Sequence, residues 1–267
     1  MINKRGNDMG RKVINRIGEE RVNNFGSKIV IIGYKKATDI DVYFPEYDWT
    51  FEHGKYDNFK NGKIKCPYER RYFGVGYLGE GKYKISNNGR PCEYYVIWYN
   101  MLMRCYDLKY QEKQPTYKGC KVEEFLLNFQ NMGKWIENNY YEVPGERMCL
   151  DKDILHKGNK VYSRDTCIFV PERINLLFTK SDKSRGDNPI GVTPISSGNY
   201  QVCCSDGYGK QIPLGTYSSK EEAFQVYKQY KENVIKETIN SYKGIIPEPH
   251  YSKLREAIYN YKVEIDD

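Results

Sequence analysis

Residues 150–175 constrain the fold of this chain more than any other segment. Their sequence is LDKDILHKGNKVYSRDTCIFVPERIN. An apolar lead-in ends at the closely spaced acids Asp151 and Asp153, a Gly-Asn turn follows, and residues 167–170 have the content of a short strand. The last residues begin a helix. The segment therefore predicts a strand, a loop, a strand and a helix, with carboxylates on the first strand and the amide of Asn175 on the helix.

Residues 1–85 have the pattern of a β-rich module that follows a basic arm. KIVIIGY at 28–34 is dense in β-branched residues, and DIDVYF at 39–44 alternates as a half-buried strand does. With the Gly and Asn turns that follow, about five short strands are expected to form a small barrel-like unit. Arg11 and Lys12 of the arm are candidates for contacts with DNA phosphates, and a solvated tail is the alternative.

The hydrophobic period becomes helical from about residue 92. EYYVIWYNMLMRCY at 93–106 predicts one helix, and VEEFLLNFQNMGKWIENN at 122–139 predicts a second. One apolar stripe runs along the second helix and is expected to face the core: Phe125, Phe129, Met132 and Ile136. The two helices are expected to support residues 150–175 rather than to act themselves.

Residues 188–245 predict three short strands with glycine turns and then a long helix. Ser219, with Glu222 three residues later, forms a capping-box pattern at the start of that helix. Residues 246–267 contain a proline link, a short helix around 253–259 and an acidic end. The fold class is therefore expected to be α+β, with several small domains at 1–85, 86–187, 188–245 and 246–267.

The composition indicates a polar, well-solvated surface with a modest positive charge. Hydrophobic residues make up 39% of the chain and the mean hydropathy is −0.78. The 42 Lys and Arg against 35 Asp and Glu give a net charge of +7, which favours nucleic acid only weakly over other partners. Neither a signal peptide nor an apolar run of about 18 residues is found, so a cytoplasmic location without a membrane partner is expected.

The eight cysteines and three histidines are scattered, and no CxxC pair occurs. A structural zinc site is therefore not expected, and the thiols are expected to stay reduced. The 26 tyrosines are also unusual. Tyr-lined cores of small β-rich domains explain most of them best, and stacking on sugars or bases is the alternative.

Residues 98–180 resemble the HNH (His-Asn-His) proteins of bacteriophages and prophages, which have a ββα-metal nuclease core. The resemblance rests on WYNMLMRCY, YKGCKVEEFLLNFQNMGKW, LDKDILHKGN and FVPERINLLF, in this order. It implies that Asp151 is the metal-binding acid, Asn159 the middle asparagine and Asn175 the final metal ligand. Lys152 stands where the family has its histidine. One Mg²⁺ or Mn²⁺ per site is implied, and such an ion needs few protein ligands because it keeps several waters.

The residue that acts as general base is left open by this pattern. A free lysine has a pKa near 10.4 and would have to lose roughly three units, while nearby phosphates raise its pKa further. Lys152 therefore suits a clamp on phosphate, Asp153 is a candidate to orient the attacking water, and His156 is a possible base. The alternative is that Asp151, Lys152 and Asp153 form surface ion pairs and that Asn159 only makes the turn.

Residues 190–240 resemble the APETALA2/ethylene-response-factor DNA-binding domain, which also occurs in phage homing endonucleases. The matching residues are Gly191, Val192, Tyr200, Leu214, Gly215, Thr216, Tyr217, Glu221, Glu222, Ala223 and Tyr227. In that family a three-stranded sheet lies in the major groove of double-stranded DNA, and a helix packs behind the sheet.

Strand alternation assigns the two faces of this predicted sheet. The helix-facing side chains are expected to be Tyr200, Val202, Ile212 and Leu214. The outward, DNA-facing side chains are expected to be Thr193, Gln201, Cys203, Ser205 and Gln211, with Lys210 nearby. The family usually has Arg and Trp at outward positions, so this chain is expected to have weak or altered specificity, with Gln201 and Gln211 suited to adenine. A small αβ unit that binds protein, or nothing, is the alternative.

Together these features predict a metal-dependent endonuclease that nicks DNA, with double-strand cutting requiring a homodimer. The first alternative is a DNA-binding protein with an inactive core that acts as a regulator or an inhibitor of host defence. The second is an accessory factor that binds a protein partner through its Tyr-rich surfaces.

Overall fold

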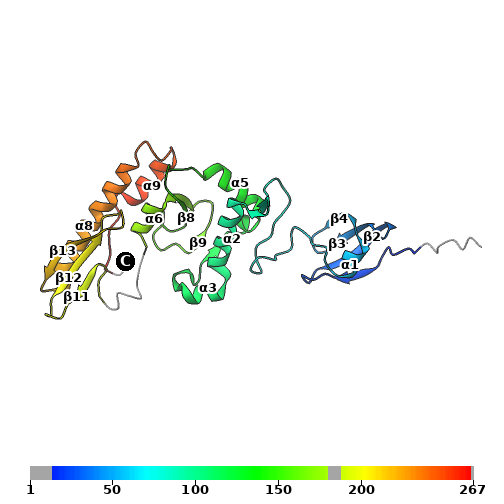
Figure 1. Ribbon diagram of the computed structural model, residues 1–267, viewed down its shortest axis with the longest axis horizontal. Coiled ribbons are helices and arrows are strands. Elements are labelled where there is room, and N and C mark those ends of the chain that lie inside the picture. The colour runs from blue at the N-terminus through cyan, green and yellow to red at the C-terminus, as the bar shows by residue number, and fades with distance from the viewer. Residues whose placement is uncertain (1–13, 180–187, 266–267) are drawn as a thin grey trace, which may run out of the picture. The chain divides into compact units, whose positions relative to one another are not determined.

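The computed structural model describes residues 14–179 and 188–265, and it contains helices together with several small sheets (Figure 1). The fold is thus of mixed α and β class, as the sequence predicts. The chain divides into two compact units, Met1–Lys82 and Tyr83–Asp267, which are described separately below. Among the described residues, no helix is both long and apolar enough to cross a membrane.

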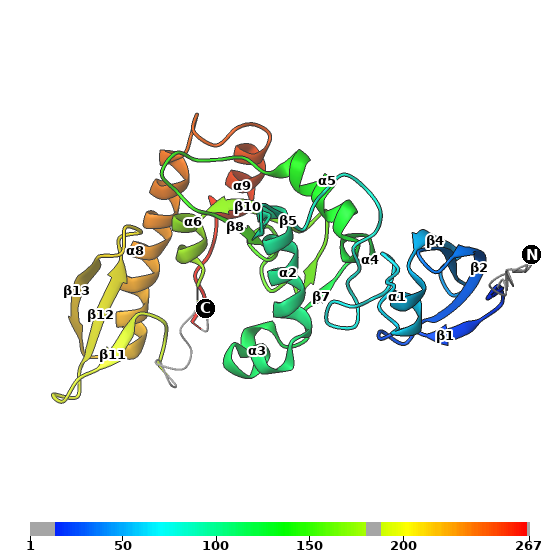
Figure 2. The ribbon, with the colours of Figure 1, turned by 45° about the vertical axis from the view of Figure 1, so that its right-hand side comes forward.

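The N-terminal unit is built on an antiparallel sheet in which each strand pairs with the next (Figure 2). Its elements are β1 (Glu20–Val22), β2 (Lys28–Lys36), β3 (Asp39–Phe44), β4 (Trp49–Gly54) and the helix α1 (Tyr56–Lys60). Alternate residues of β3 are buried, so one face of the sheet packs on a core. The buried core residues are Ile29, Ile31, Ile40, Val42, Phe44, Phe59, Ile64 and Cys66.

This sheet is open, in contrast to the barrel-like unit expected from the sequence. Its order is β1-β2-β3-β4, and within residues 14–82 the edge strands β1 and β4 do not pair. Closing a barrel requires enough strands, tilted and staggered, to surround a core. Four strands, of which β1 has only three residues, do not meet that requirement.

The first part of the second unit is mainly helical. Its first elements are β5 (Ser86–Asn87), β6 (Arg90–Pro91), α2 (Glu93–Tyr106), α3 (Leu108–Lys113), the 3₁₀ turn η1 (Pro115–Tyr117), β7 (Lys121–Val122), α4 (Glu124–Leu127) and α5 (Phe129–Asn139). α2 has the predicted bounds. It packs on α5 through Trp98 and Phe129, whose ring centroids are 5.4 Å apart, and the Trp98 indole N–H donates to the Leu126 carbonyl at 3.0 Å.

The single helix predicted over 122–139 is wrong, because Asn128 interrupts it. Asn128 has an extended backbone (φ −78°, ψ 120°), and its Oδ1 accepts from the Gln130 amide at 2.8 Å. An asparagine in that conformation caps a new helix rather than continuing the old one. Phe125, on the earlier side of the break, is consequently 36% exposed, whereas Phe129 is fully buried.

The remaining elements of the second unit form a small sheet with one helix and a larger sheet with another. They are β8 (Met148–Asp151), β9 (Val161–Tyr162), β10 (Ile168–Pro171), α6 (Glu172–Leu177), β11 (Val192–Pro194), β12 (Tyr200–Ser205), β13 (Gln211–Tyr217), α8 (Lys220–Ser241) and α9 (His250–Ile258). β8 pairs antiparallel with β10, β7 pairs parallel with β9, and β11-β12-β13 form an antiparallel sheet.

The helix α8 covers one face of the sheet β11–β13. The shared core contains Val192, Val202, Cys204, Ala223, Phe224, Tyr227 and Val263. The predicted cap of α8 is confirmed, since the Ser219 hydroxyl accepts from the Glu222 amide at 3.1 Å. The segments expected as separate domains after residue 85 lie in one unit; Tyr242, at the end of α8, donates from its hydroxyl to Glu146 Oε2 at 2.7 Å.

Candidate functional site

The site is framed by β8, β10 and α6. Asp151 is the last residue of β8, and its partner across the sheet is Ile168 of β10. All four residues of β10 are buried, so this strand anchors the site in the core. Pro171 precedes α6 directly with φ −54°, the backbone angle that its ring favours and that leads into a helix. Asp151 therefore stands where a fixed strand gives way to a loop.

The Asp151 carboxyl organises the first turn of that loop. Its Oδ1 accepts from the backbone N–H groups of Asp153 at 2.8 Å and Ile154 at 2.7 Å. Burial, and then the negative charge of Asp153, raise the pKa of Asp151 to about 6, although the two N–H groups oppose the shift. Burial makes the ionised form of this carboxyl unfavourable in free energy, and a cation bound beside it would offset much of that penalty.

The charge of Lys152 interacts with that of Asp151, but the Lys152 ammonium turns inward and forms its ion pair with Asp153. It is only 6% exposed, and its Nζ lies 2.9 Å from Asp153 Oδ2 and 5.9 Å from the centre of the Tyr162 ring. Burial disfavours its charge, but the hydrogen bond and charge of Asp153 outweigh burial and raise the pKa of Lys152. A buried, protonated lysine is unsuited to act as a base, and it does not lie on the surface as a phosphate clamp would.

Asp153 lies in the turn rather than on the strand, since β8 ends at Asp151. Strand alternation therefore does not bring Asp151 and Asp153 to one face. The two residues are held close together by the turn, in which Asp151 Oδ1 accepts from the Asp153 amide. The side chain of Asp153 is 44% exposed and pairs with Lys152. The expectation of ion pairing in this segment thus holds for Lys152 and Asp153, with the lysine buried rather than on the surface.

Asn159 closes the loop that begins at Asp151. Its Nδ2 donates to the carbonyl oxygens of Lys152 at 2.6 Å and Val161 at 2.7 Å, and its Oδ1 accepts from the Val161 amide at 3.2 Å. The side chain thus ties the residue after Asp151 to the start of β9. His156 is exposed on the same loop. Asn175 is half-buried on α6, where its backbone carbonyl accepts from the Phe178 amide at 3.2 Å.

Arg104 is a residue of this region that the sequence analysis does not single out. It lies on α2, its guanidinium carbon is 5.6 Å from the Tyr117 ring centre, and its buried Nε has no hydrogen-bond partner. Burial disfavours its charge, but Tyr162 and Tyr117 more than compensate and raise the pKa of Arg104. Tyr162 therefore lies near both Arg104 and Lys152. The only available signal was an arginine inside the apolar run 93–106.

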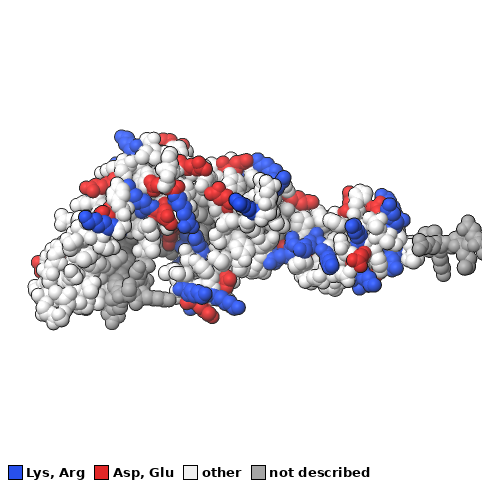
Figure 3. Space-filling view, viewed as in Figure 1, with Lys and Arg blue, Asp and Glu red and all other residues white. Residues whose placement is uncertain are grey.

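The outward face of the sheet β11–β13 is polar and carries little charge. Thr193 pairs with Gln201, which pairs with Thr216, so these side chains form one row across the sheet. Ser205 and Gln211 are paired at the far end, beside the exposed Lys210. In Figure 3 the region of this sheet is largely white, whereas lysines and arginines gather elsewhere. Arg11 and Lys12 lie outside the described residues.

A bulge in β13, where Leu214 is the extra residue, leaves the predicted faces of β12 unchanged. The pairing with β13 shifts between Val202 and Cys203. Val202 and Cys204 are buried against α8, while Gln201 is exposed and Cys203 only half-buried. The alternation thus persists along β12. The polar residues that were predicted to face DNA therefore lie on the side of the sheet opposite α8.

One group of acid and imidazole side chains has metal-like spacing within the described residues. Atoms of Asp39, Asp41 and His53 all lie within 4.8 Å of one another in the N-terminal unit. His53 Nδ1 is 2.9 Å from Asp39 Oδ1, Lys35 Nζ is 3.7 Å from Asp39 Oδ2, and the His53 amide donates to Asp41 at 3.1 Å. Ion pairing within the group accounts for the arrangement without a metal.

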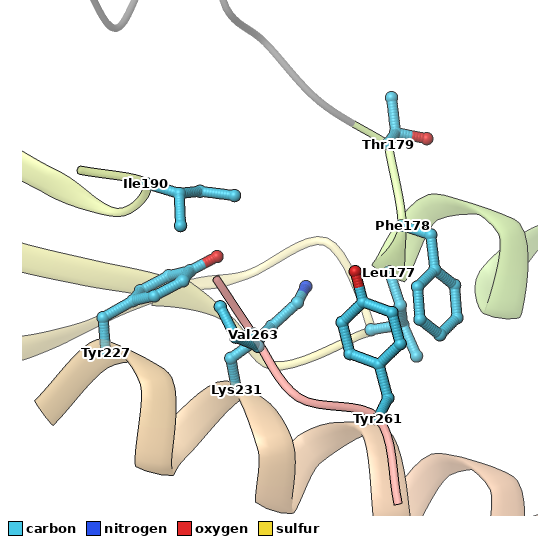
Figure 4. Close-up of a pocket in the computed structure, with 8 residues that line it drawn as sticks. All are labelled: Leu177, Phe178, Thr179, Ile190, Tyr227, Lys231, Tyr261 and Val263. Atoms are coloured by element: carbon cyan, nitrogen blue, oxygen red, sulfur yellow. The ribbon is translucent and has the colours of Figure 1, made fainter. Parts of the chain in front are cut away.

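A small cavity of about 20 Å³ lies beside α8, with the side chain of Lys231 directed into it (Figure 4). Its lining residues are Leu177, Phe178, Thr179, Ile190, Tyr227, Lys231, Tyr261 and Val263. A space of this size holds about one water molecule. Burial lowers the pKa of Lys231. The cavity is therefore too small for a substrate and concerns the stability of the unit.

Comparison of the chain with protein-family models, with curated proteins and with solved structures finds no match.

Proposed function

We propose that this protein is a DNA endonuclease that depends on a divalent metal ion, with an HNH-like ββα core at β8, β10 and α6 and an APETALA2-like DNA-binding sheet at β11–β13. The observation that carries the proposal is the Asp151 carboxyl. It stands at the end of β8, its pKa is raised by burial, and the ion pair of Lys152 is made with Asp153. Carboxyl groups perturbed in this way occur preferentially at functional sites.

The donor set of the core suits a hard cation. Asp151 offers one carboxylate, of which Oδ1 already accepts two backbone N–H groups, and Asn175 of α6 is proposed to add an amide oxygen. One carboxylate and one amide are enough for Mg²⁺ or Mn²⁺, which keep several waters. A bound ion would supply positive charge to the scissile phosphate and help to activate the attacking water.

The other residues of the loop act by holding Asp151 in position. Asn159 fixes the loop through its two carbonyl contacts, and the pair of Lys152 and Asp153 fixes the turn. Arg104 provides a second, half-buried positive charge near Tyr162. His156 is the one imidazole of this loop and remains the candidate general base, since a neutral imidazole accepts a proton near pH 7.

The sheet β11–β13 is proposed to contact double-stranded DNA through Thr193, Gln201, Ser205, Lys210 and Gln211. Their amide and hydroxyl groups favour hydrogen bonds to base edges, with glutamine suited to adenine. Only Lys210 among them carries charge, so this face would add little to the salt dependence of binding. Arg11 and Lys12 are proposed to contribute phosphate contacts. The resemblance suggests a phage or prophage protein that acts in the bacterial cytoplasm.

A second candidate function is favoured by the position of Lys152. Where the HNH family has its histidine, this chain has a lysine that is buried and protonated. A core without its base would still hold DNA, and the protein would then act as a regulator or as an inhibitor of host defence, with a protein partner. A homodimer remains a requirement only for cutting both strands.

The two functions are separated by incubating supercoiled plasmid with the protein and Mg²⁺ or Mn²⁺. The first predicts metal-dependent nicking that is lost in Asp151→Ala and Asn175→Ala. Asp165→Ala, which removes an exposed acid from the same segment, serves as the control and should nick normally. DNA binding without nicking would support the second function instead, and neither binding nor nicking would reject both.

A further inference from the structure

The second unit carries three exposed lysines next to the loop that begins at Asp151. Lys118 directly follows the turn η1, Lys121 begins β7, and Lys160 directly precedes β9. Within residues 14–179 and 188–265, none of their ammonium groups forms an ion pair with an acidic side chain. These three residues are termed the lysine cluster. Their charges are therefore not balanced by the protein itself.

Backbone pairing brings the members of the lysine cluster together. β7 and β9 pair in parallel with Lys121 opposite Val161, and the Lys121 amide donates to the Lys160 carbonyl at 2.8 Å. The Lys160 ammonium donates to the Thr116 carbonyl at 2.7 Å, which fixes it beside the turn that ends before Lys118. Like charges held close together repel one another, and an anion bound among them would remove this repulsion.

The lysine cluster has hydrogen-bond donors available for such an anion. An ammonium has three N–H donors, so Lys160 keeps two of them after its bond to the Thr116 carbonyl. Two acids close by are engaged elsewhere. Glu123 Oε1 accepts from Arg164 Nε at 3.0 Å, and Asp153 pairs with the buried Lys152. Neither acid therefore neutralises the cluster.

The lysine cluster borders the proposed metal site. The residue before Lys160 is Asn159, whose side chain closes the loop that begins at Asp151. On the other strand, the buried thiol of Cys120 lies within electrostatic range of both Lys160 and Asp153. A phosphate bound by the cluster would therefore lie next to the loop on which the metal ion is proposed to bind.

Duplex DNA is the partner that this position favours. Proteins draw much of their affinity for DNA from lysines and arginines that neutralise phosphates. The polar face of the sheet β11–β13 offers only Lys210 for this purpose, so phosphate contacts are needed elsewhere in the unit. An acidic protein surface would also be attracted to lysines, but it would have no need of a position beside the loop of Asp151.

We propose that the lysine cluster binds the phosphate backbone of double-stranded DNA and thereby places one strand at Asp151. Each ammonium would neutralise one phosphate and release the counterions held there. Such contacts carry no sequence information, so the cluster would position the DNA while the sheet β11–β13 reads its bases. The inference rests on the proposed function for the role of Asp151, but binding of DNA by the cluster does not require cleavage.

The test measures binding of the full chain to a labelled DNA duplex by fluorescence anisotropy, from about 50 to about 200 mM salt and with EDTA to prevent cleavage. Lys118, Lys121 and Lys160 are replaced together by glutamine, which can still donate to the Thr116 carbonyl. The logarithm of the binding constant falls with the logarithm of the salt concentration, with a slope of about 0.9 per phosphate contact. The magnitude of this slope is therefore expected to decrease by about 2 to 3 in the triple variant.

The control variant replaces three other exposed lysines of the same unit by glutamine and should keep the slope of the unsubstituted chain: Lys134, Lys243 and Lys253. The three single variants of the lysine cluster, each expected to lose about 0.9, decide the question even if the triple variant does not fold. The inference is overturned if substitution of the cluster leaves the slope unchanged, or if the chain does not bind the duplex.

Failure of the proposed endonuclease would give a different result. Nicking with Mg²⁺ would then be absent, while the lysine variants would still change the salt dependence of binding. If nicking takes place, the triple variant should raise the KM for plasmid several-fold, because fewer phosphates are bound. A KM that stays unchanged would overturn the placement of the DNA strand at Asp151.

Discussion

Replacing Asp151 by asparagine is expected to stabilise the second unit when no metal ion is present. The Asp151 pKa rises from 3.8 to about 6 on folding. Each pH unit is equivalent to about 1.36 kcal/mol, so the ionised carboxyl costs up to about 3 kcal/mol. Asparagine retains an oxygen for the two backbone N–H groups and carries no charge. Its NH₂ group needs an acceptor of its own, so a net gain of about 1 to 3 kcal/mol is expected.

The sign of the pH dependence follows from the raised pKa. The neutral carboxyl is tolerated below pH 3.8, and stability is lost as the pH rises through about 6, where the folded protein must release the proton. The advantage of Asp151→Asn should therefore be full at pH 7.5 and fall to about half at pH 5. Added Mg²⁺ should stabilise the unsubstituted protein and have little effect on the variant.

Urea unfolding measures this effect directly. The chain has three tryptophans, and Trp98 and Trp135 lie in the second unit, so their fluorescence in a Trp49→Phe background reports on that unit alone. Asp165→Asn is the control, because the same change at an exposed acid should leave the free energy of unfolding almost unchanged. A variant at position 151 that is less stable at pH 7.5, or a gain that does not change with pH, would refute the reasoning.

Three further predictions concern single side chains. Burial lowers the pKa of Lys231, so its charge opposes folding at neutral pH; Lys231→Met should raise the free energy of unfolding by about 1 kcal/mol in thermal melts, and the gain should shrink as the pH approaches 10.4. Ser219→Ala removes the cap of α8 and should cost about 1 kcal/mol, whereas Ser218→Ala should be neutral. The carboxylate of Asp39, which accepts a hydrogen bond from the His53 ring, raises the pKa of His53, so a proton NMR titration should place this pKa above 6.5, and Asp39→Asn should lower it towards 6.5.

Local patterns in the sequence were sufficient to predict several elements. The bounds of α2 and of β3 match the runs from which they were predicted, because each run has one clear hydrophobic period. The break at Asn128 was missed, because the apolar stripe continues across it and only the side-chain cap shows that the helix restarts. The open sheet of the first unit was also missed, because strand closure depends on pairing between distant residues.

At the candidate site, too, the sequence could not predict features that depend on contacts between distant residues. Asp151, Asn159 and Asn175 were proposed as site residues from the resemblance to the HNH proteins, and the strand, loop and helix expected to carry them are present. The inward turn of Lys152 was not predictable, since it depends on Tyr162 and on the ion pair with Asp153. The position of Arg104 likewise depends on contacts with residues far along the chain. Long-range burial, rather than local pattern, decides these roles.

The rate of plasmid nicking as a function of Mg²⁺ concentration is the most direct test of the proposed endonuclease. The account predicts that nicking rises with Mg²⁺, stops when the ion is chelated, and falls at least about 100-fold in Asp151→Asn while Asp165→Asn stays unchanged. Nicking that persists in Asp151→Asn, or a pure protein that binds DNA and never nicks it at any Mg²⁺ or Mn²⁺ concentration, would contradict it.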